Sequence, residues 1–167
     1  MERLGIKYFL MFVVLVAVQV LFLNQIQFSG FINPYIYILF IMLLPLNSPR
    51  YAVLLLAFII GLVVDVFSNT LGMHTAAAVF IAYLRPLIIR AITNREEELN
   101  DYPGLVQTGV IWFVTYTAIM VVIHHAVLFY LEVFSFHNFF STLYRVFLSS
   151  IFSIFVIVLS QFIIFRD

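Results

Sequence analysis

The sequence predicts an all-α integral membrane protein, a bundle of about six transmembrane helices forming a single domain over residues 1–167. Hydrophobic residues make up 65% of the chain and charged residues only 10%, and the mean hydropathy is +1.15. A soluble domain of 167 residues could not bury so much apolar surface, so the bilayer is the solvent. The apolar runs also lack the polar–apolar alternation of a lipid-facing β-barrel.

Composition also restricts the function. The formal net charge is zero, which argues against nucleic acid as a partner. Cysteine is absent, and this excludes disulfides, thiolate metal sites and cysteine nucleophiles. The chain has no G-x-S-x-G elbow, P-loop, H-E-x-x-H pattern or paired-carboxylate spacing. We therefore expect a protein that is not an enzyme and needs no cofactor.

The first predicted helix covers residues 8–23, after the charged residues Glu2, Arg3 and Lys7. No small-residue cleavage site follows it, so we expect an uncleaved transmembrane helix rather than a signal peptide. The second apolar run, 34–46, is shorter than the roughly 20 residues of a full crossing. We expect it to be tilted, partly buried or incompletely spanning. The remaining spans are predicted over residues 51–67, 72–92, 105–131 and 138–165.

The basic residues predict the orientation. With a cytoplasmic N-terminus, only Arg145 falls on the outer side, and the inner helix ends collect Arg3, Lys7, Arg50, Arg85, Arg90, Arg95 and Arg166. This bias places both termini in the cytoplasm. Pro86 is expected to bend the fourth helix, and Arg85 to anchor its inner end at the head groups.

The segment 61–74 is the candidate functional corner of the chain. Ala57, Gly61 and Asp65 are spaced i, i+4, i+8 and share one helix face. Small residues let a neighbouring backbone approach closely, and an acid within a membrane marks a site by default. Asp65 is predicted to hold a partner helix, to form a cation or proton site, or to cap the loop amides of residues 68–70.

Arg145 is the expected counter-charge of Asp65. The sixth helix carries a polar stripe at spacings of three and four, consisting of Asn138, Thr142, Arg145, Ser149 and Ser153. Such a stripe faces the bundle interior or another protein rather than lipid. We therefore expect an Asp65–Arg145 pair.

The histidines offer a weaker alternative, a metal site formed by His74, His124 and His137 toward the outer face. His124 and His125 are adjacent, so on a helix they point about 100° apart and do not face one ion together. The competing expectation is histidines that are hydrogen-bonded to neighbouring helices, with no metal bound.

Several motifs of residues 33–86 resemble the family of bacterial rod shape-determining proteins MreD, in the variant typical of the Bacteroidetes. They are Asn33-Pro34, Leu44-Pro45 with Pro49-Arg50, the Gly61–Asp65–Ser68–Gly72–His74 pattern and Leu84-Arg85-Pro86. The resemblance implies a structural or partner-binding role for Gly61, Asp65, Ser68, Gly72, Arg85 and Pro86. We expect the same role for Ala57 from its place on the face of Gly61 and Asp65.

The same resemblance implies a multi-pass protein of the bacterial inner membrane that acts as a scaffold for cell elongation. Members associate with the bitopic protein MreC and, through it, with MreB filaments, RodA and a penicillin-binding transpeptidase. The family's fold is similar to the six-helix substrate-binding component of energy-coupling-factor transporters. The rival expectation is therefore a membrane subunit that binds a vitamin or metal for transport, and a lipid-modifying enzyme ranks last.

Overall fold

The computed structural model describes residues 2–25, 32–93, 101–134 and 139–163, and the regular structure in these ranges is helical. Five helices are long and apolar enough to cross a membrane. The elements are α1 (Glu2–Leu21), a 3-10 turn η1 (Leu23–Gln25), α2 (Ile38–Met42), α3 (Arg50–Ser68), α4 (Met73–Ile92), α5 (Leu105–Thr108), α6 (Val110–Val133) and α7 (Phe139–Ile163). The predicted all-α membrane architecture is thereby confirmed.

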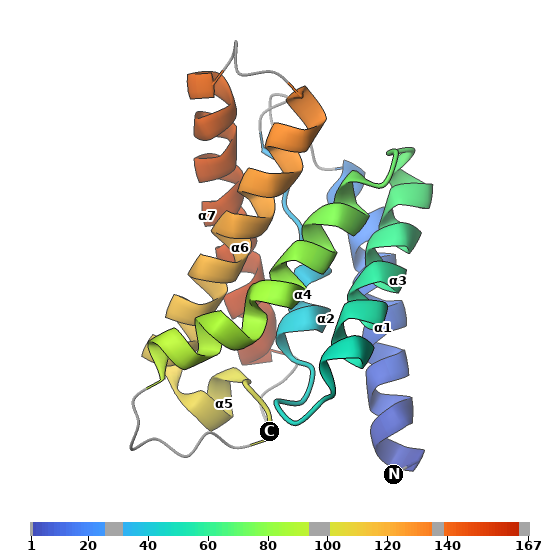
Figure 1. Ribbon diagram of the computed structural model, residues 1–167, viewed down its shortest axis with the longest axis vertical. Coiled ribbons are helices and arrows are strands. Elements are labelled where there is room, and N and C mark those ends of the chain that lie inside the picture. The colour runs from blue at the N-terminus through green and yellow to red at the C-terminus, as the bar shows by residue number, and fades with distance from the viewer. Residues whose placement is uncertain (1, 26–31, 94–100, 135–138, 164–167) are drawn as a thin grey trace.

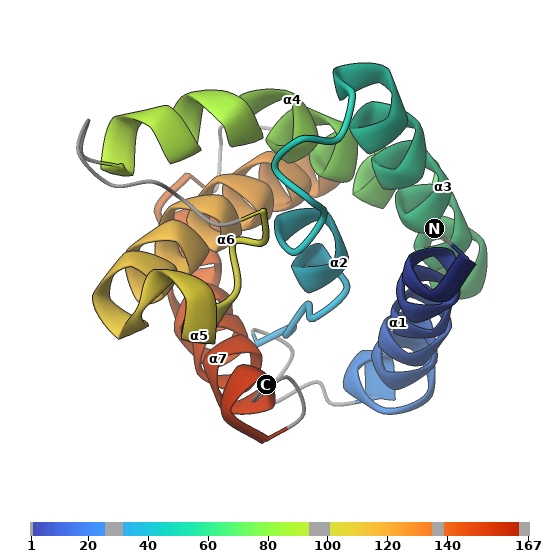
Figure 2. The same ribbon diagram turned by 90° about the horizontal axis from the view of Figure 1, so that it is seen from below.

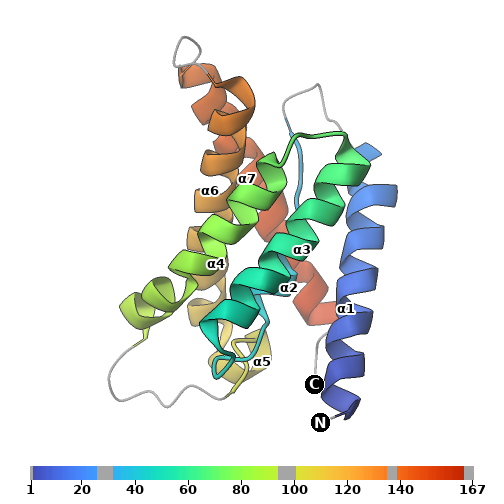
Figure 3. The same ribbon diagram turned by 45° about the vertical axis from the view of Figure 1, so that its right-hand side comes forward.

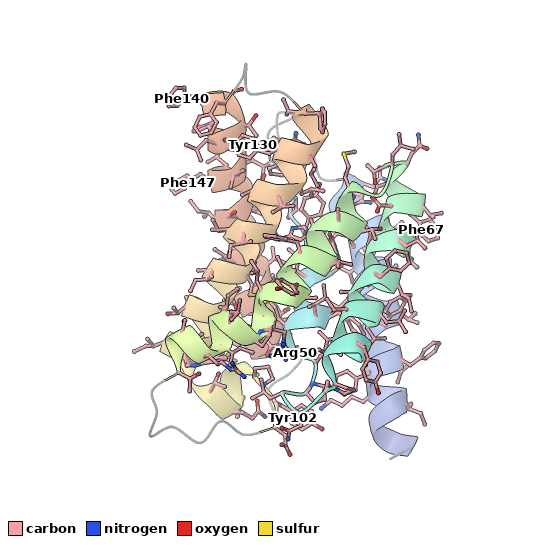
Figure 4. All side chains as sticks on the ribbon, viewed as in Figure 1. Arg50, Phe67, Tyr102, Tyr130, Phe140 and Phe147 are labelled. Carbon is pink, nitrogen blue, oxygen red and sulfur yellow. The ribbon has the colours of Figure 1, made fainter. Side chains whose placement is uncertain are left out.

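The long helices are arranged around α2. Neighbours pack in the order α1, α3, α4, α6 and α7, and Figure 2 shows α2 at the centre of this arrangement. Helix α1 begins and α7 ends at the same end of the bundle, here called the terminal end (Figure 1). Arg50 lies toward the terminal end of α3, whereas Phe67 lies toward the opposite end, here called the far end (Figure 4).

The outward faces of the long helices are apolar. Phe9 on α1 is 67% exposed and Phe155 on α7 is 62% exposed, and Phe147 projects away from the bundle in Figure 4. Large apolar side chains exposed along whole helices would be unstable in water, because each forgoes the free energy of burial. The outer surface therefore suits contact with acyl chains.

Residues 34–46 do not form the second transmembrane helix that the count of six required. Only Ile38–Met42 is helical, and the segment runs through the interior from the far end toward the terminal end (Figures 1 and 3). Tyr37, Ile38 and Leu39 are fully buried. Non-helical backbone is tolerated at membrane depth only where protein surrounds it and supplies hydrogen bonds. The described residues therefore contain five spanning helices and one buried crossing.

At its beginning, the buried crossing is held by polar side chains of α1 and α7. Ser149 Oγ accepts a hydrogen bond from Asn33 N at 3.1 Å, and Ser153 Oγ accepts one from Tyr35 N at 2.9 Å. Gln19 on α1 accepts from the next amide, that of residue 36, at 2.8 Å and donates to the carbonyl of residue 34 at 3.1 Å. The predicted inward direction of the α7 stripe is confirmed at Ser149 and Ser153, while Asn138 lies outside the described residues.

At the end of the crossing, Arg85 on α4 binds the backbone of the segment. Its Nη2 donates to the carbonyls of Leu44 and, at 3.4 Å, Met42, and its Nε donates to the Tyr116 hydroxyl at 3.2 Å. Arg85 is only 4% exposed. The expectation that it anchors α4 at the head groups is therefore wrong, because the carbonyls left free where α2 ends recruit its guanidinium. The helix continues past Pro86.

The predicted helix 105–131 is divided in the structure. Gly109 has φ 81° and ψ 160°, which ends α5 and starts α6. Glycine adopts such a positive φ without the steric cost that a Cβ would impose. This spanning helix therefore begins at Val110 rather than at Leu105.

Candidate functional site at the far end

Helices α3 and α4 are in direct backbone contact at the corner between them, because Gly61 has no side chain to separate them. A Cβ added at Gly61 would lie 2.5 Å from Thr75 Cα and 2.9 Å from Thr75 N. Ala57, one turn earlier on α3, is fully buried on the same face. The predicted close approach on this small-residue face is confirmed, and it brings the first turn of α4 against the last turns of α3.

Asp65 uses this proximity to cap α4. Its carboxylate accepts hydrogen bonds from the amides of His74 at 3.0 Å and Thr75 at 2.8 Å, and from the Thr75 hydroxyl at 2.5 Å. The first amides of a helix have no partner within it, and the helix dipole favours an anion there. The residue before α4, Gly72, has φ 81° and carries no side chain that could cap. Asp65 therefore supplies the cap from the preceding helix.

Two further contacts fix the same carboxylate. The Thr70 hydroxyl donates to Asp65 Oδ1 at 2.5 Å, and His74 Nδ1 lies 3.1 Å from that oxygen. Because an ionised carboxylate only accepts, His74 Nδ1 carries the proton in this contact. Asp65 is 2% exposed, so the acid is buried with its oxygens satisfied. Of the predicted roles, the cap is present, although on the amides of residues 74 and 75 rather than 68–70.

The expected Asp65–Arg145 pair is not formed. Arg145 Nη1 instead contacts Glu132 Oε2 at 2.9 Å, its guanidinium stacks 4.2 Å above the Phe129 ring, and the Asn33 amide oxygen can accept from its Nη2. The expectation failed because the α4 terminus satisfies Asp65, and because Glu132 lies closer to Arg145 on the neighbouring helix α6. Both acids and Arg145 nevertheless lie toward the far end.

The histidines meet around Tyr35 rather than around an ion. The Tyr35 ring lies within 6 Å, centroid to centroid, of His74, His124 and His125. His124 Nε2 is 2.6 Å from the Tyr37 hydroxyl, and His125 Nε2 is 3.1 Å from Ser153 Oγ. The described residues hold no group of three or more His, Cys, Asp or Glu that could bind a metal. His137 of the metal alternative lies outside them.

A polar cavity of about 350 Å³ opens beside this cluster. Its wall includes residues whose contacts are described above, namely Asn33, Thr70, His74, Glu132 and Arg145. Asn24 of η1 and Ser68 of α3 also line it. Asn24 Nδ2 donates to Ser68 Oγ at 2.9 Å. His74 Nε2 and Arg145 Nε are buried without a hydrogen-bond partner in the described part of the chain. The cavity therefore combines an ion pair with unused hydrogen-bonding capacity.

Sequence reasoning missed two buried residues, Gln19, which bonds the backbone of the crossing segment, and Tyr37, whose hydroxyl contacts His124. Gln19 is a polar residue within an apolar run of the first helix, and this pattern alone could have marked it as buried and functional. Tyr37 carried no such indication, because tyrosine near a predicted helix end is typical of the membrane interface.

Fold and site together define a multi-pass, all-helical membrane protein with a buried crossing and a polar far-end cavity. Comparison with protein-family models, curated proteins and solved structures gives no match for this chain.

Proposed function

We propose that this chain is a non-enzymatic scaffold of the bacterial inner membrane, an MreD-like component of the cell-elongation machinery. It would bind MreC and so help to couple MreB filaments to RodA, the transpeptidase and peptidoglycan synthesis. The supporting observation is that residues of the MreD-like motif form contacts inside this protein. Gly61, Asp65 and Arg85 all serve contacts within the protein, as a rigid platform for partners requires.

In this proposal the N- and C-termini face the cytoplasm. Lys7, Arg50 and Arg90 belong to helix ends at the terminal end, whereas Arg145 lies near the start of α7 at the far end. Positive charge concentrates on the cytoplasmic side of membrane proteins. The far-end cavity would then open toward the periplasm.

The far-end cavity supports a second candidate, the substrate-binding subunit of a transporter. Ligand pockets occupy about 300–1,000 Å³ and use a few convergent polar groups, and this one has about 350 Å³. Arg145 Nε would be its unused donor, and His74 Nε2, in a ring whose proton is on Nδ1, its unused acceptor. An energy-coupling-factor-like fold, proposed from the family resemblance, would place substrate at this end.

One experiment separates the two candidates. The chain is depleted from its host and replaced by the wild type or by the Glu132→Gln variant, which alters a cavity-lining carboxylate that is 41% exposed. A scaffold predicts that both restore rod shape and co-purify with MreC. Co-purification with an ATPase module and a stoichiometric small molecule, both lost in the variant, would overturn the scaffold.

A further inference from the structure

A second cavity lies at the terminal end, between the start of α3 and the end of α4, and is lined by three arginines. Its volume is about 290 Å³, and Arg50, Arg85 and Arg90 all contribute to its wall, together with Ser48. Arg50 is the first residue of α3, and Arg90 lies in the last turn of α4. The antiparallel helices therefore bring three positive charges to one place.

No carboxylate of the described residues compensates these charges. None of the three arginines forms an ion pair with a carboxylate of the described residues. The hydrogen bonds of Arg85 go from Nε and Nη2 to neutral oxygens, so Nη1 takes no part in them. A buried, uncompensated guanidinium is costly unless an anion lies near it. The cavity is therefore a candidate site for an anion.

The surroundings indicate what carries that anion. Tyr51, Leu55 and Leu87 on the flanking faces of α3 and α4 are 76%, 58% and 55% exposed. Leu54 and Leu87 also belong to the cavity wall, so the site opens among side chains that face acyl chains. Basic pockets between transmembrane helices on the cytoplasmic side are suited to anionic lipid head groups.

We propose that this three-arginine cavity binds the phosphate of an anionic glycerophospholipid. The buried Arg85 supplies a fixed charge and the exposed Arg50 and Arg90 supply two more, while the acyl chains lie along the apolar faces of α3 and α4. The same Arg85 holds the end of the buried crossing, so lipid binding here would stabilise that segment. This inference rests on the orientation given under Proposed function but not on the scaffold role, and the binding test below does not depend on either.

The test measures lipid binding to the purified full-length protein by native mass spectrometry in neutral detergent. Phosphatidylglycerol and phosphatidylcholine are titrated against the wild type, the double variant Arg50→Gln/Arg90→Gln and the single variant Arg90→Gln. Both substituted side chains are exposed, so the fold is expected to survive, and a thermal unfolding scan checks this. Lys7→Gln is the matched control, because Lys7 is an exposed cation near the start of α1 that does not line the cavity.

We expect the wild type to prefer phosphatidylglycerol, and the double variant to lose about 10- to 30-fold in affinity, as two surface cations should contribute. Arg90→Gln should lose part of this, and Lys7→Gln less than threefold. Equal binding of phosphatidylcholine, or an equal loss in Lys7→Gln, would overturn the proposal. Displacement of the lipid by low-millimolar inorganic phosphate would assign the cavity to free phosphate and overturn the lipid assignment.

Discussion

Asp65, near the end of α3, accepts two hydrogen bonds from Thr75 in the first turn of α4, one from its amide at 2.8 Å and one from its hydroxyl at 2.5 Å. The two residues are ten positions apart, and the carboxylate replaces the N-cap side chain that Gly72 lacks. The α3–α4 hairpin thus depends on one buried acid.

Replacing Asp65 should destabilise the protein strongly. Asp65→Ala leaves the amides of His74 and Thr75 without their acceptor, at a cost of about 1–3 kcal/mol for such buried groups. Asp65→Asn keeps one acceptor oxygen and should cost less. Thermal unfolding in detergent measures both. Asp101→Ala is the control, because its carboxylate bonds Asn47 in an exposed position, and an equal loss there would contradict the cap.

Gly61→Ala should also be destabilising, for a steric reason. The new Cβ would lie 2.5 Å from Thr75 Cα, so the helices must separate, and overpacking of this kind costs about 1–3 kcal/mol. Gly5→Ala is the matched control, since nothing lies within 4 Å of its Cβ position and alanine favours the helix. Unfolding temperatures should fall for Gly61→Ala alone. A stable Gly61→Ala protein would mean that the helices are not in close contact.

Alanine substitutions of three serines on α7 should differ in how much stability they cost, because the serines differ in their hydrogen-bond partners. Ser153→Ala leaves the buried amide of Tyr35 unpaired, at a cost of about 1–3 kcal/mol. Ser149→Ala leaves the part-buried amide of Asn33 unpaired and should cost less. Ser150 Oγ is buried without a hydrogen-bond partner among the described residues, so Ser150→Ala should be neutral or stabilising. The comparison uses chemical or thermal unfolding of three single variants. Equal losses of stability in all three variants would contradict the contacts between α7 and the crossing segment.

A double-mutant cycle should locate the partner of Arg145. Arg145→Met and Glu132→Gln should be non-additive by about 1 kcal/mol, since the pair is partly exposed and surface pairs contribute little. Arg145→Met and Asp65→Asn should be additive. The cycle is measured as unfolding free energies or, where unfolding is irreversible, as shifts in unfolding temperature. Coupling to Asp65 instead would restore the pair that the sequence predicted.

The proposed orientation can be tested directly, because the chain contains no native cysteine. Leu71→Cys introduces a thiol at a position that is 98% exposed at the far end, and Lys7→Cys introduces one near the start of α1. A membrane-impermeant maleimide should label the first in intact spheroplasts and the second only after permeabilisation. The unsubstituted chain is the blank. The reverse labelling pattern would place the termini outside.

Much of the far-end site could be predicted from local patterns. The spacing of Ala57, Gly61 and Asp65 predicted a close helix contact with an acid at its rim, and the α7 serines predicted an inward polar face. The wrong partner was assigned to Asp65 because Arg145 offers the opposite charge, and the amides expected for a cap were those of residues 68–70 rather than those of the next helix. Backbone amides at a helix start also attract a carboxylate, but their position relative to Asp65 depends on the turn at residues 69–72.

The sequence by itself determined that this protein lies in a membrane, that five of its apolar runs form long helices, and that Asp65 and the α7 stripe turn inward. These properties follow from hydropathy and helical periodicity, which act within a few turns of one chain segment. Only the tertiary structure decided that residues 34–46 cross the interior largely without a helix, that Arg85 holds their carbonyls, and that Arg145 pairs with Glu132. Those choices depend on distances between segments remote in sequence, because a buried polar group takes whichever partner the packing brings within reach.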